Sequence, residues 1–420
     1  MKQQVSYKKV LRFICAQEEK TKMRILLLSS LYAPHIVGGA EIAARNYAEQ
    51  LEKLGHEIFV LTSSYGLDAP KQEGRIWRTL RFVPGHFWSY RYPANAVELR
   101  RVIAEVQPEL LYVWEIMGLG LVPILKVLNA SNIPVVYQQQ SYWLLYVLKL
   151  QTGYSYVRYR WIKRLLIGAV PFPRYTSMIA VSDVVKEEHV KLGCDAKRIE
   201  VIYNGIDESF ITTPCSQEDH KEADHIRLVY VGRLCSAKGV LVLLKAMDIL
   251  VNEQKQAQFT LDIFGADDEE YTKKLYDFVK EKRLESAVIF HGKVRQGELI
   301  RQYDRADIVI IPSIWKEPGC AVIIEAMARG VPLIATNIGG TSEMVTHGVD
   351  GLLVEPGDEH ALAATILQLA YDSSLRNKLA EASCATVKER YTVEGTARRI
   401  EQHLLKALTG YRLDLATASS

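Results

Sequence analysis

Short runs of consecutive apolar residues alternate along this chain with stretches in which apolar residues recur at helical spacing. The runs are typical of buried parallel strands, and the stretches between them indicate amphipathic helices. This alternation predicts doubly wound parallel sheets, and 420 residues are enough for two domains with separate cores. The pattern predicts strands at 24–29, 57–62, 109–114, 135–137, 179–182, 199–202, 226–231, 259–264, 288–294, 306–313, 330–336 and 351–354.

A polar stretch around Pro214 separates the two halves and indicates a linker. At the N-terminus, Lys8, Lys9 and Arg12 precede only a very short apolar patch, which makes a poor signal peptide. We therefore expect a disordered leader at 1–22, a Rossmann-like domain at 23–205, a linker at 206–225, a second Rossmann-like domain at 226–395, and a C-terminal helix and tail at 396–420.

Two glutamates, Glu317 and Glu325, flank the start of the helix that is predicted to follow the strand at 306–313. Because Pro is tolerated in a first helical turn, we expect this helix to begin at Pro318, with free backbone N–H groups at the strand's carboxyl end. Such a helix start favours phosphate, whereas the two carboxylates favour neutral hydroxyls beside it, as on a sugar or a ribose. For the pair taken alone, the alternative is two solvated surface glutamates.

Glycines and cations follow two other predicted strands. Gly38-Gly39 forms either a tight turn or a close backbone approach to a phosphate or a sugar. The G-x-G-x-x-G pattern and the acidic residue of nicotinamide-binding folds are absent. Arg233 and Lys238 follow the strand at 226–231, at the end where parallel sheets bind ligands. There they would neutralise a diphosphate; the alternative is a pair of routine surface cations.

Residues 142–174 carry six basic side chains and no acidic one. If 154–167 is helical, one face carries Tyr154, Val157, Trp161 and Leu165. The opposite face carries Arg160, Lys163 and Arg164, whereas Arg158 lies near the apolar side and breaks the pattern. This pattern is typical of a helix on an anionic membrane surface; the alternative is a helix packed on the sheet with a solvated basic face. Nucleic acid is not expected, because no further basic surface extends the footprint. The six residues are Lys149, Arg158, Arg160, Lys163, Arg164 and Arg174.

Composition excludes several other classes of protein. No apolar run reaches the ~18–20 residues of a membrane-spanning helix. Six cysteines without a C-x-x-C suggest neither a disulfide framework nor a zinc ribbon and fit a reducing compartment. Asp267-Asp268, considered as metal ligands, instead indicate a solvated helix start. Residues 23–205 hold 21 basic and 15 acidic side chains and 206–420 hold 25 and 32, so the first half is expected to face something anionic.

Taken together and in this order, the motifs resemble glycosyltransferase family 4, over residues 23 to about 395. The resemblance implies an α/β fold of the GT-B type, with two Rossmann-like doubly wound parallel-sheet domains facing across a cleft. The first domain would hold the acceptor and the second the donor. The matching stretches are Gly38-Gly39-Ala40-Glu41, Val181-Ser182, Asn204-Gly205-Ile206-Asp207, Gly232-Arg233-Leu234, Lys238-Gly239, the segment from Glu317 to Pro332, Gly339-Gly340 and Glu343.

The resemblance also implies retaining transfer of a hexosyl group from a nucleotide diphosphate sugar to a glycan or lipid-linked acceptor, with no cofactor and no obligatory metal. Arg233, Lys238 and Glu317 would be the catalytic residues: the two cations stabilise the leaving diphosphate, and the glutamate contacts the hexose. Glu325 would accept from the ribose hydroxyls. The donor-binding residues would be Gly38, Gly39, Gly265, Val294, Gly319, Cys320, Ala321 and Glu325, and the acceptor-binding residues Gln140 and Ser141.

This chain departs from the family at Gln140, where many members carry a histidine. An amide can hydrogen-bond a sugar hydroxyl but cannot act as a base. A catalytically impaired protein that binds a nucleotide sugar or a glycan is therefore a second hypothesis, and a sugar-nucleotide epimerase or phosphorylase is a third. We expect a cytoplasmic enzyme of polysaccharide or glycolipid biosynthesis, with peripheral attachment to the inner face of the membrane if the basic stretch 142–174 binds there.

Overall fold

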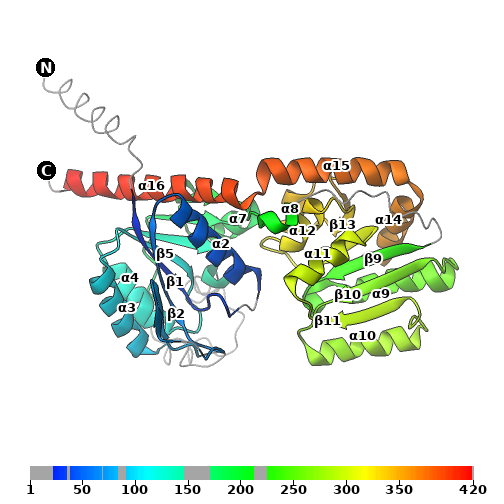
Figure 1. Cartoon of the computed structure of the whole chain (residues 1–420), viewed down its shortest axis with the longest axis horizontal. Helices are drawn as coiled ribbons and strands as arrows, with labels where there is room; N and C mark the ends of the chain where they lie inside the picture. Colours follow the sequence, from blue (N-terminus) through cyan, green and yellow to red (C-terminus); the bar gives the residue numbers. More distant parts are fainter. Residues whose placement is uncertain are drawn as a thin grey trace, which may run out of the picture. The chain divides into compact units, whose positions relative to one another are not determined.

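A computed structural model of the protein describes residues 22–35, 38–68, 70–83, 91–145, 171–211 and 225–418 (Figure 1). These residues form two compact units. The first takes in the described parts of 22–138, 171–178 and 401–418, and the second those of 139–145 and 179–400. The expected leader, apart from Lys22, and most of the basic stretch 142–174 lie outside the described residues. The domain boundaries expected from the sequence stay a prediction.

Within the described residues the first sheet has eight strands. From β4 onward, its strand order reverses once, between β1 and β5. β1 pairs in parallel with both β2 and β5, and β4 continues in parallel beside β2. The short β3 is antiparallel to β4. In spatial order the strands are β3 (Gln72–Glu73), β4 (Ile76–Leu80), β2 (Glu57–Ser63), β1 (Arg24–Ser29), β5 (Leu110–Glu115), β6 (Val135–Gln139), β7 (Ser177–Ala180) and β8 (Ile199–Val201).

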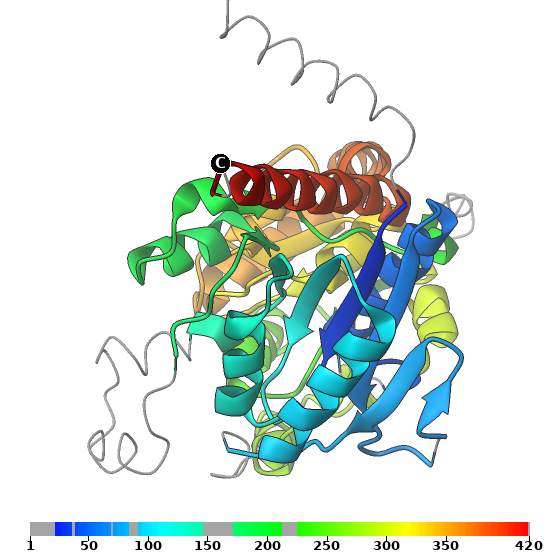
Figure 2. The same cartoon turned by 90° about the vertical axis from the view of Figure 1, so that its left-hand side faces the viewer.

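Helices cover both faces of this sheet, as the prediction of a doubly wound arrangement requires. α3 (Pro93–Val106) and α4 (Leu121–Ala130) lie side by side on one face, and α2 (Gly39–Lys53) lies on the other (Figures 1 and 2). α2 ends before Gly55, whose φ of +101° suits the residue that follows a helix. Further along the chain, the described residues form the helix α7 (Asp183–Lys191) and the 3₁₀ turn η2 (Ala196–Arg198).

The second sheet has six strands, and every neighbouring pair is parallel. Its strand order also reverses once, between β9 and β12. In open parallel sheets, ligands bind beyond the carboxyl ends of the strands at such a reversal. In spatial order the strands are β11 (Val288–Gly292), β10 (Phe259–Phe264), β9 (Ile226–Val231), β12 (Ile308–Ile311), β13 (Leu333–Thr336) and β14 (Leu352–Val354).

The apolar run of β9 shows why these strands are hydrophobic throughout. Leu228 and Tyr230 pack into one core, whereas Val229 between them packs into a second core on the opposite face. A central strand covered on both faces buries successive side chains in two different cores. The described helices and helical turns of this part of the chain are α8 (Glu208–Ile211), η4 (Ser236–Lys238), α9 (Val240–Asp248), the π-helical turn η5 (Ile249–Glu253), α10 (Glu269–Glu281), α11 (Gln296–Asp304), α12 (Ala321–Ala328), α13 (Thr341–Met344), α14 (Glu359–Tyr371), α15 (Ser373–Arg390) and α16 (Val393–Ala418), whose residues 401–418 belong to the first unit.

One predicted boundary is wrong. The helix expected to begin at Pro318 begins at Ala321, so Glu325 lies one turn rather than two inside it. The carbonyl oxygen of Glu317 accepts from the N–H of Gly340 at 2.7 Å instead of starting a helical turn, which delays the helix. Part of the expected linker is also structured, since α8 lies within it. Among the helices of the described residues, none combines the length and the apolar character needed to cross a bilayer.

Candidate functional site

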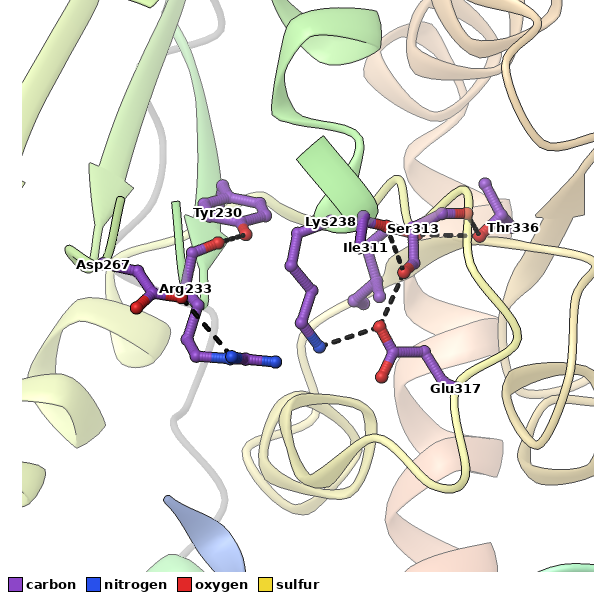
Figure 3. A network of polar contacts seen from close by, with 9 residues as sticks. Tyr230, Arg233, Lys238, Asp267, Ile311, Ser313, Glu317 and Thr336 are labelled. Atoms are coloured by element: carbon purple, nitrogen blue, oxygen red, sulfur yellow. Dashed lines mark hydrogen bonds and ion pairs between the residues drawn. The ribbon is translucent and has the colours of Figure 1, made fainter. Parts of the chain in front are cut away.

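Lys238, Glu317 and Ser313 meet at the carboxyl edge of the second sheet, where the strand order reverses between β9 and β12 (Figure 3). Nζ of Lys238 lies 2.8 Å from Oε1 of Glu317. Oγ of Ser313 lies 2.6 Å from the same oxygen and 3.1 Å from the carbonyl oxygen of Ala237. A hydroxyl has one proton, so Ser313 donates to the closer, charged acceptor. Glu317 is only 3% exposed, and its Oε2 has no donor among the described residues.

Arg233 extends from the loop that also carries Lys238, but it is held more weakly (Figure 3). Its side chain is 61% exposed, and Nη1 lies 3.4 Å from Oδ2 of Asp267, which follows β10. The hydroxyl of Tyr230 donates to the carbonyl oxygen of Arg233 at 2.8 Å. The loop backbone is therefore fixed. The guanidinium can turn toward a ligand, because an exposed ion pair of this length contributes little stability.

Two glycines bring the loop after β9 against its neighbours. At Gly239, φ is +67° and a Cβ atom would lie 1.8 Å from the carbonyl oxygen of Pro312, after β12. At Gly265, φ is +146° and a Cβ atom would lie 1.8 Å from the carbonyl oxygen of Gly232. No side chain fits at these distances, so only glycine allows the three loops to approach this closely.

A second pair of glycines supports the backbone at Glu317. Gly339 has a φ of +62°, and a Cβ atom there would lie 2.7 Å from the backbone nitrogen and oxygen of Glu317. A Cβ atom on Gly340 would lie 2.5 Å from the carbonyl oxygen of Pro318. The loop after β13 thus packs directly on the segment that presents the Glu317 carboxylate.

Glu325 lies on α12 and accepts a hydrogen bond of 2.7 Å from the fully buried Tyr303 of α11. Burial raises the pKa of the Glu325 carboxyl, and the bond from Tyr303 partly opposes this shift. Burial also raises the pKa of the Cys320 thiol, at the N-cap of α12, to about 11, so Cys320 is uncharged at neutral pH. No side chain among the described residues caps α12, so its first N–H groups are available to an anion.

The other predicted donor-binding residues lie in both units. In the second unit, Gly319 and Ala321 lie just before α12 and at its start, and Val294 follows β11 at the same edge. Gly38 and Gly39 belong to the first unit, where Glu41 accepts from the N–H of Gly38 at 2.8 Å. The predicted roles of all these residues toward a donor stay predictions.

Gln140 follows β6, and its amide pairs with that of Asn204. Nε2 of Gln140 donates to Oδ1 of Asn204 at 2.8 Å, and Nδ2 of Asn204 donates back to Oε1 of Gln140 at 2.7 Å. Oγ of Ser141 lies 3.4 Å from the backbone nitrogen of Trp143, from which it accepts. The reciprocal amide bonds orient Gln140 and occupy one of its two N–H donors. Its contact with an acceptor stays a prediction.

The two aspartates considered as metal ligands have separate structural roles. The side chain of Asp268 accepts from the N–H of Tyr271 at 2.9 Å and caps α10, which confirms the predicted helix start. Asp267 pairs with Arg233. Within the described ranges, no three or more His, Cys, Asp or Glu side chains gather into a metal site. The expected independence from a metal or other cofactor stays a prediction.

Sequence reasoning missed Ser313, Tyr303 and the pairing of Asp267 with Arg233. Ser313 carries a weak sequence signal, because it follows a buried strand at its carboxyl end and precedes Glu317 by four residues. The hydroxyl of Thr336 donates to the carbonyl oxygen of Ser313 at 2.6 Å, and this bond fixes the loop after β12. Tyr303 lies 22 residues before Glu325 along the chain, and no spacing rule connects the two.

Comparisons with known proteins agree with this architecture. Residues 37–210 match the family described as Glycosyltransferase Family 4, and residues 215–385 match the family described as Glycosyl transferases group 1. The chain is 27% identical over 393 residues to an uncharacterized glycosyltransferase of Methanocaldococcus jannaschii, an alignment that covers 90% of this chain and 96% of that protein.

Two further comparisons bear on the fold and the class of enzyme. The amylovoran biosynthesis glycosyltransferase AmsK of Erwinia amylovora is 30% identical over 204 residues, which are 47% of this chain and 48% of that protein. Anabaena HepE in complex with UDP-glucose has a similar fold, with a TM-score of 0.67 at 22% identity over 91% of this chain and 100% of that one. Together, the two family matches cover residues 37–210 and 215–385, which is most of the chain. The chain therefore belongs to the glycosyltransferases of family 4, with the GT-B fold.

Proposed function

We propose that the protein transfers a hexosyl group from a nucleotide diphosphate sugar to a glycan or lipid-linked acceptor, with retention of anomeric configuration. The observation that carries this proposal is the group formed by Lys238, Glu317, Ser313 and Arg233 at the strand reversal of the second sheet. The fold of HepE, which binds UDP-glucose, supports a nucleotide sugar as the donor.

In this proposal the cations stabilise the leaving diphosphate. Negative charge develops on the phosphate oxygen as the glycosidic bond breaks, and preorganised positive charge lowers the energy of that state. Lys238 is positioned for this role because Glu317 and the η4 turn hold its ammonium group at the carboxyl edge. Arg233 is free to turn toward the diphosphate, and the uncapped start of α12 adds N–H donors.

The two glutamates would select hydroxyl groups of the donor. Oε1 of Glu317 is occupied by Lys238 and Ser313, whereas Oε2 has no donor among the described residues and is available to a hexose hydroxyl. Glu325 retains acceptor capacity beside its bond from Tyr303 and would bind the ribose. The acceptor would be deprotonated by the departing phosphate, because the amide of Gln140 cannot act as a base.

The test is donor turnover by the purified full chain, screened against nucleotide sugars with and without acceptors. We expect Lys238→Met and Glu317→Gln each to lower kcat/KM at least tenfold, since a lost charged contact costs ~1.5–3 kcal/mol. Lys274 and Glu270 provide a matched control, because they form an exposed ion pair of 3.0 Å on α10. Lys274→Met and Glu270→Gln should leave turnover unchanged. Equal activity in all four variants would contradict the site.

The same screen separates the alternative functions. Tight donor binding without turnover across a broad acceptor panel would identify a binding protein, and an altered nucleotide sugar formed without acceptor would identify an epimerase. Contact with an anionic membrane through residues 142–174 is a further proposal, motivated by their six basic side chains. If this proposal is correct, the full chain should co-sediment with anionic liposomes at low salt, and the co-sedimentation should weaken as salt is added.

A further inference from the structure

We propose that the acceptor carries a phosphoryl group, and that a basic pocket around Arg78 in the first unit binds it. The identification of this ligand as the acceptor rests on the proposed function, whereas the pocket itself is independent of it. The pocket has a volume of about 610 Å³ and lies where β2 and β4 end and α3 begins. Its lining includes Tyr65, after β2, and Tyr92, the N-cap residue of α3.

Arg78 is the residue that points to an anionic ligand. It is 3% exposed, and its Nη2 donates to the carbonyl oxygen of Ala33 at 2.6 Å. Its Nε and Nη1 are buried and have no acceptor among the described residues. A guanidinium is always charged, and a buried charge without a partner is costly. Since Arg78 also lines the pocket, a bound anion is the natural partner for these two donors.

The backbone holds Arg78 in this position. Its N–H donates to the carbonyl oxygen of Lys71 at 2.7 Å, and β3 pairs with β4 on either side of a tight turn. Lys71 itself lines the pocket, so the same hairpin delivers two cations to it. A guanidinium held on a strand by a backbone bond is preorganised for an oxyanion and loses little freedom on binding.

The remaining charges of the pocket add to this field. Arg81 and Arg101 also line it, and Glu98 is the one acid among the described residues of the lining. Arg101 donates to both oxygens of Glu98, at 2.9 Å from Nε and 2.7 Å from Nη2, and these bonds lower the pKa of Glu98. Glu98 is thus ionised and neutralised by Arg101. The other three cations of the lining, Lys71, Arg78 and Arg81, have no carboxylate partner among its described residues. This excess of positive charge suits a phosphate dianion or a diphosphate better than a single carboxylate.

Aromatic rings form another part of the lining. The rings of Tyr65 and Phe82 lie 4.9 Å apart between centroids, and the guanidinium of Arg81 lies 5.5 Å from the Tyr92 ring. Flat apolar surfaces beside a cluster of cations suit a sugar ring or a prenyl chain attached to the phosphoryl group. The shared chemistry is therefore a phosphoryl oxyanion, and its source is either a soluble sugar phosphate or a lipid-linked diphosphate.

Calorimetry on the full chain at low salt tests the pocket with two probes: glucose 1-phosphate, and a polyprenyl diphosphate in detergent micelles. Glucose, glucuronate and the free polyprenol are the matched ligands without a phosphoryl group. We expect binding that persists in Lys238→Met, weakens with salt, and falls at least tenfold in Arg78→Met and in the double variant Lys71→Gln with Arg81→Gln. Lys71 and Arg81 are exposed, so the double variant keeps the test valid if Arg78→Met does not fold. Arg100→Gln, on α3 outside the lining, should bind like the wild type.

Binding of the first probe alone identifies a soluble sugar phosphate as the source, and binding of the second alone identifies a lipid-linked diphosphate. The inference is overturned if neither probe binds, if glucuronate or glucose binds as well as glucose 1-phosphate, or if the pocket variants bind like the wild type. Failure of the proposed function would look different, since phosphoryl binding at Arg78 would persist in a chain that transfers no sugar.

Discussion

The ion pair between Lys238 and Glu317 predicts a specific pattern of stability changes in the second unit. Two unit charges 2.8 Å apart attract each other by about 6 kcal/mol at an effective dielectric constant of 20, and desolvation offsets most of this. Removing one partner leaves the other charge largely buried, which costs ~3–5 kcal/mol. The side chain of Glu317 is 4% exposed and that of Lys238 is 19% exposed. Lys238→Met, which isolates the more buried charge, should therefore destabilise more than Glu317→Gln.

Glu317→Gln has a second reason to be milder. The amide oxygen of the glutamine can still accept from both Lys238 and Ser313, whereas in Lys238→Met the Oε1 atom of Glu317 loses one of its two donors. The double variant removes both charges together. We expect it to be more stable, by at least ~2 kcal/mol, than the sum of the two single changes implies.

Native-state hydrogen exchange of the β9 and β12 amides is the suitable assay, because it reports the opening free energy of the second sheet itself. The exposed ion pair of Lys274 and Glu270, with an N–O distance of 3.0 Å, supplies the control. In a double-mutant cycle on this pair, we expect a coupling free energy below ~0.5 kcal/mol. Equal coupling in the two cycles would refute the reasoning, since burial would then have no effect. A larger loss in Glu317→Gln than in Lys238→Met would refute the order of the two single variants.

Two further predictions concern stability. His189 is fully buried, its Nδ1 lies 2.7 Å from the Val185 carbonyl oxygen, and burial lowers its pKa to about 4. The unfolded chain therefore binds the proton more tightly, so about 3 kcal/mol of stability should be lost as the pH falls from ~6.5 to ~4. Urea midpoints across this range should change less in His189→Gln, and parallel pH profiles would contradict the assignment. Gly265→Ala should destabilise far more than Gly292→Ala: both have positive φ, but a Cβ atom at Gly292 meets no atom within 4 Å and costs only ~1–2 kcal/mol. Thermal melts would measure this, and similar losses in both would show that the contact with Gly232 is easily relieved.

Apart from β3 and β4, the strands of both sheets could be predicted because their signal is local. Parallel strands buried on both faces are continuous apolar runs, and β1, β9 and β12 are of this kind. Between 63 and 109 the sequence pattern predicts no element, although β3, β4 and α3 lie there. β3 has two exposed residues, and β4 places the charged Arg78 at a buried position, so neither has the apolar pattern of a covered strand.

The sequence was sufficient to predict which loops carry the candidate site. Arg233, Lys238 and Glu317 each follow an apolar strand, and the carboxyl ends of parallel strands share one edge. Their partners could not be predicted in the same way. The bond from Tyr303 to Glu325 and the pairing of Arg233 with Asp267 depend on how α11 and the loop after β10 pack in three dimensions. The start of α12 was mispredicted for a related reason, because Gly340 binds the Glu317 carbonyl oxygen from a distant part of the sequence.

The two cationic sites differ in the state of their charges without a ligand. In the second unit Lys238 is paired with Glu317 and Arg233 with Asp267, so these carboxylates already offset part of the positive charge that would meet a diphosphate. The offset would limit how tightly the diphosphate binds on its own, and would leave more of the interaction energy for a state in which its charge increases. In the first unit, Nε and Nη1 of Arg78 have no acceptor among the described residues, so a phosphoryl group would add a partner without displacing one. The first arrangement suits a leaving group that must be stabilised as it departs, and the second suits a group that stays bound while the sugar is transferred.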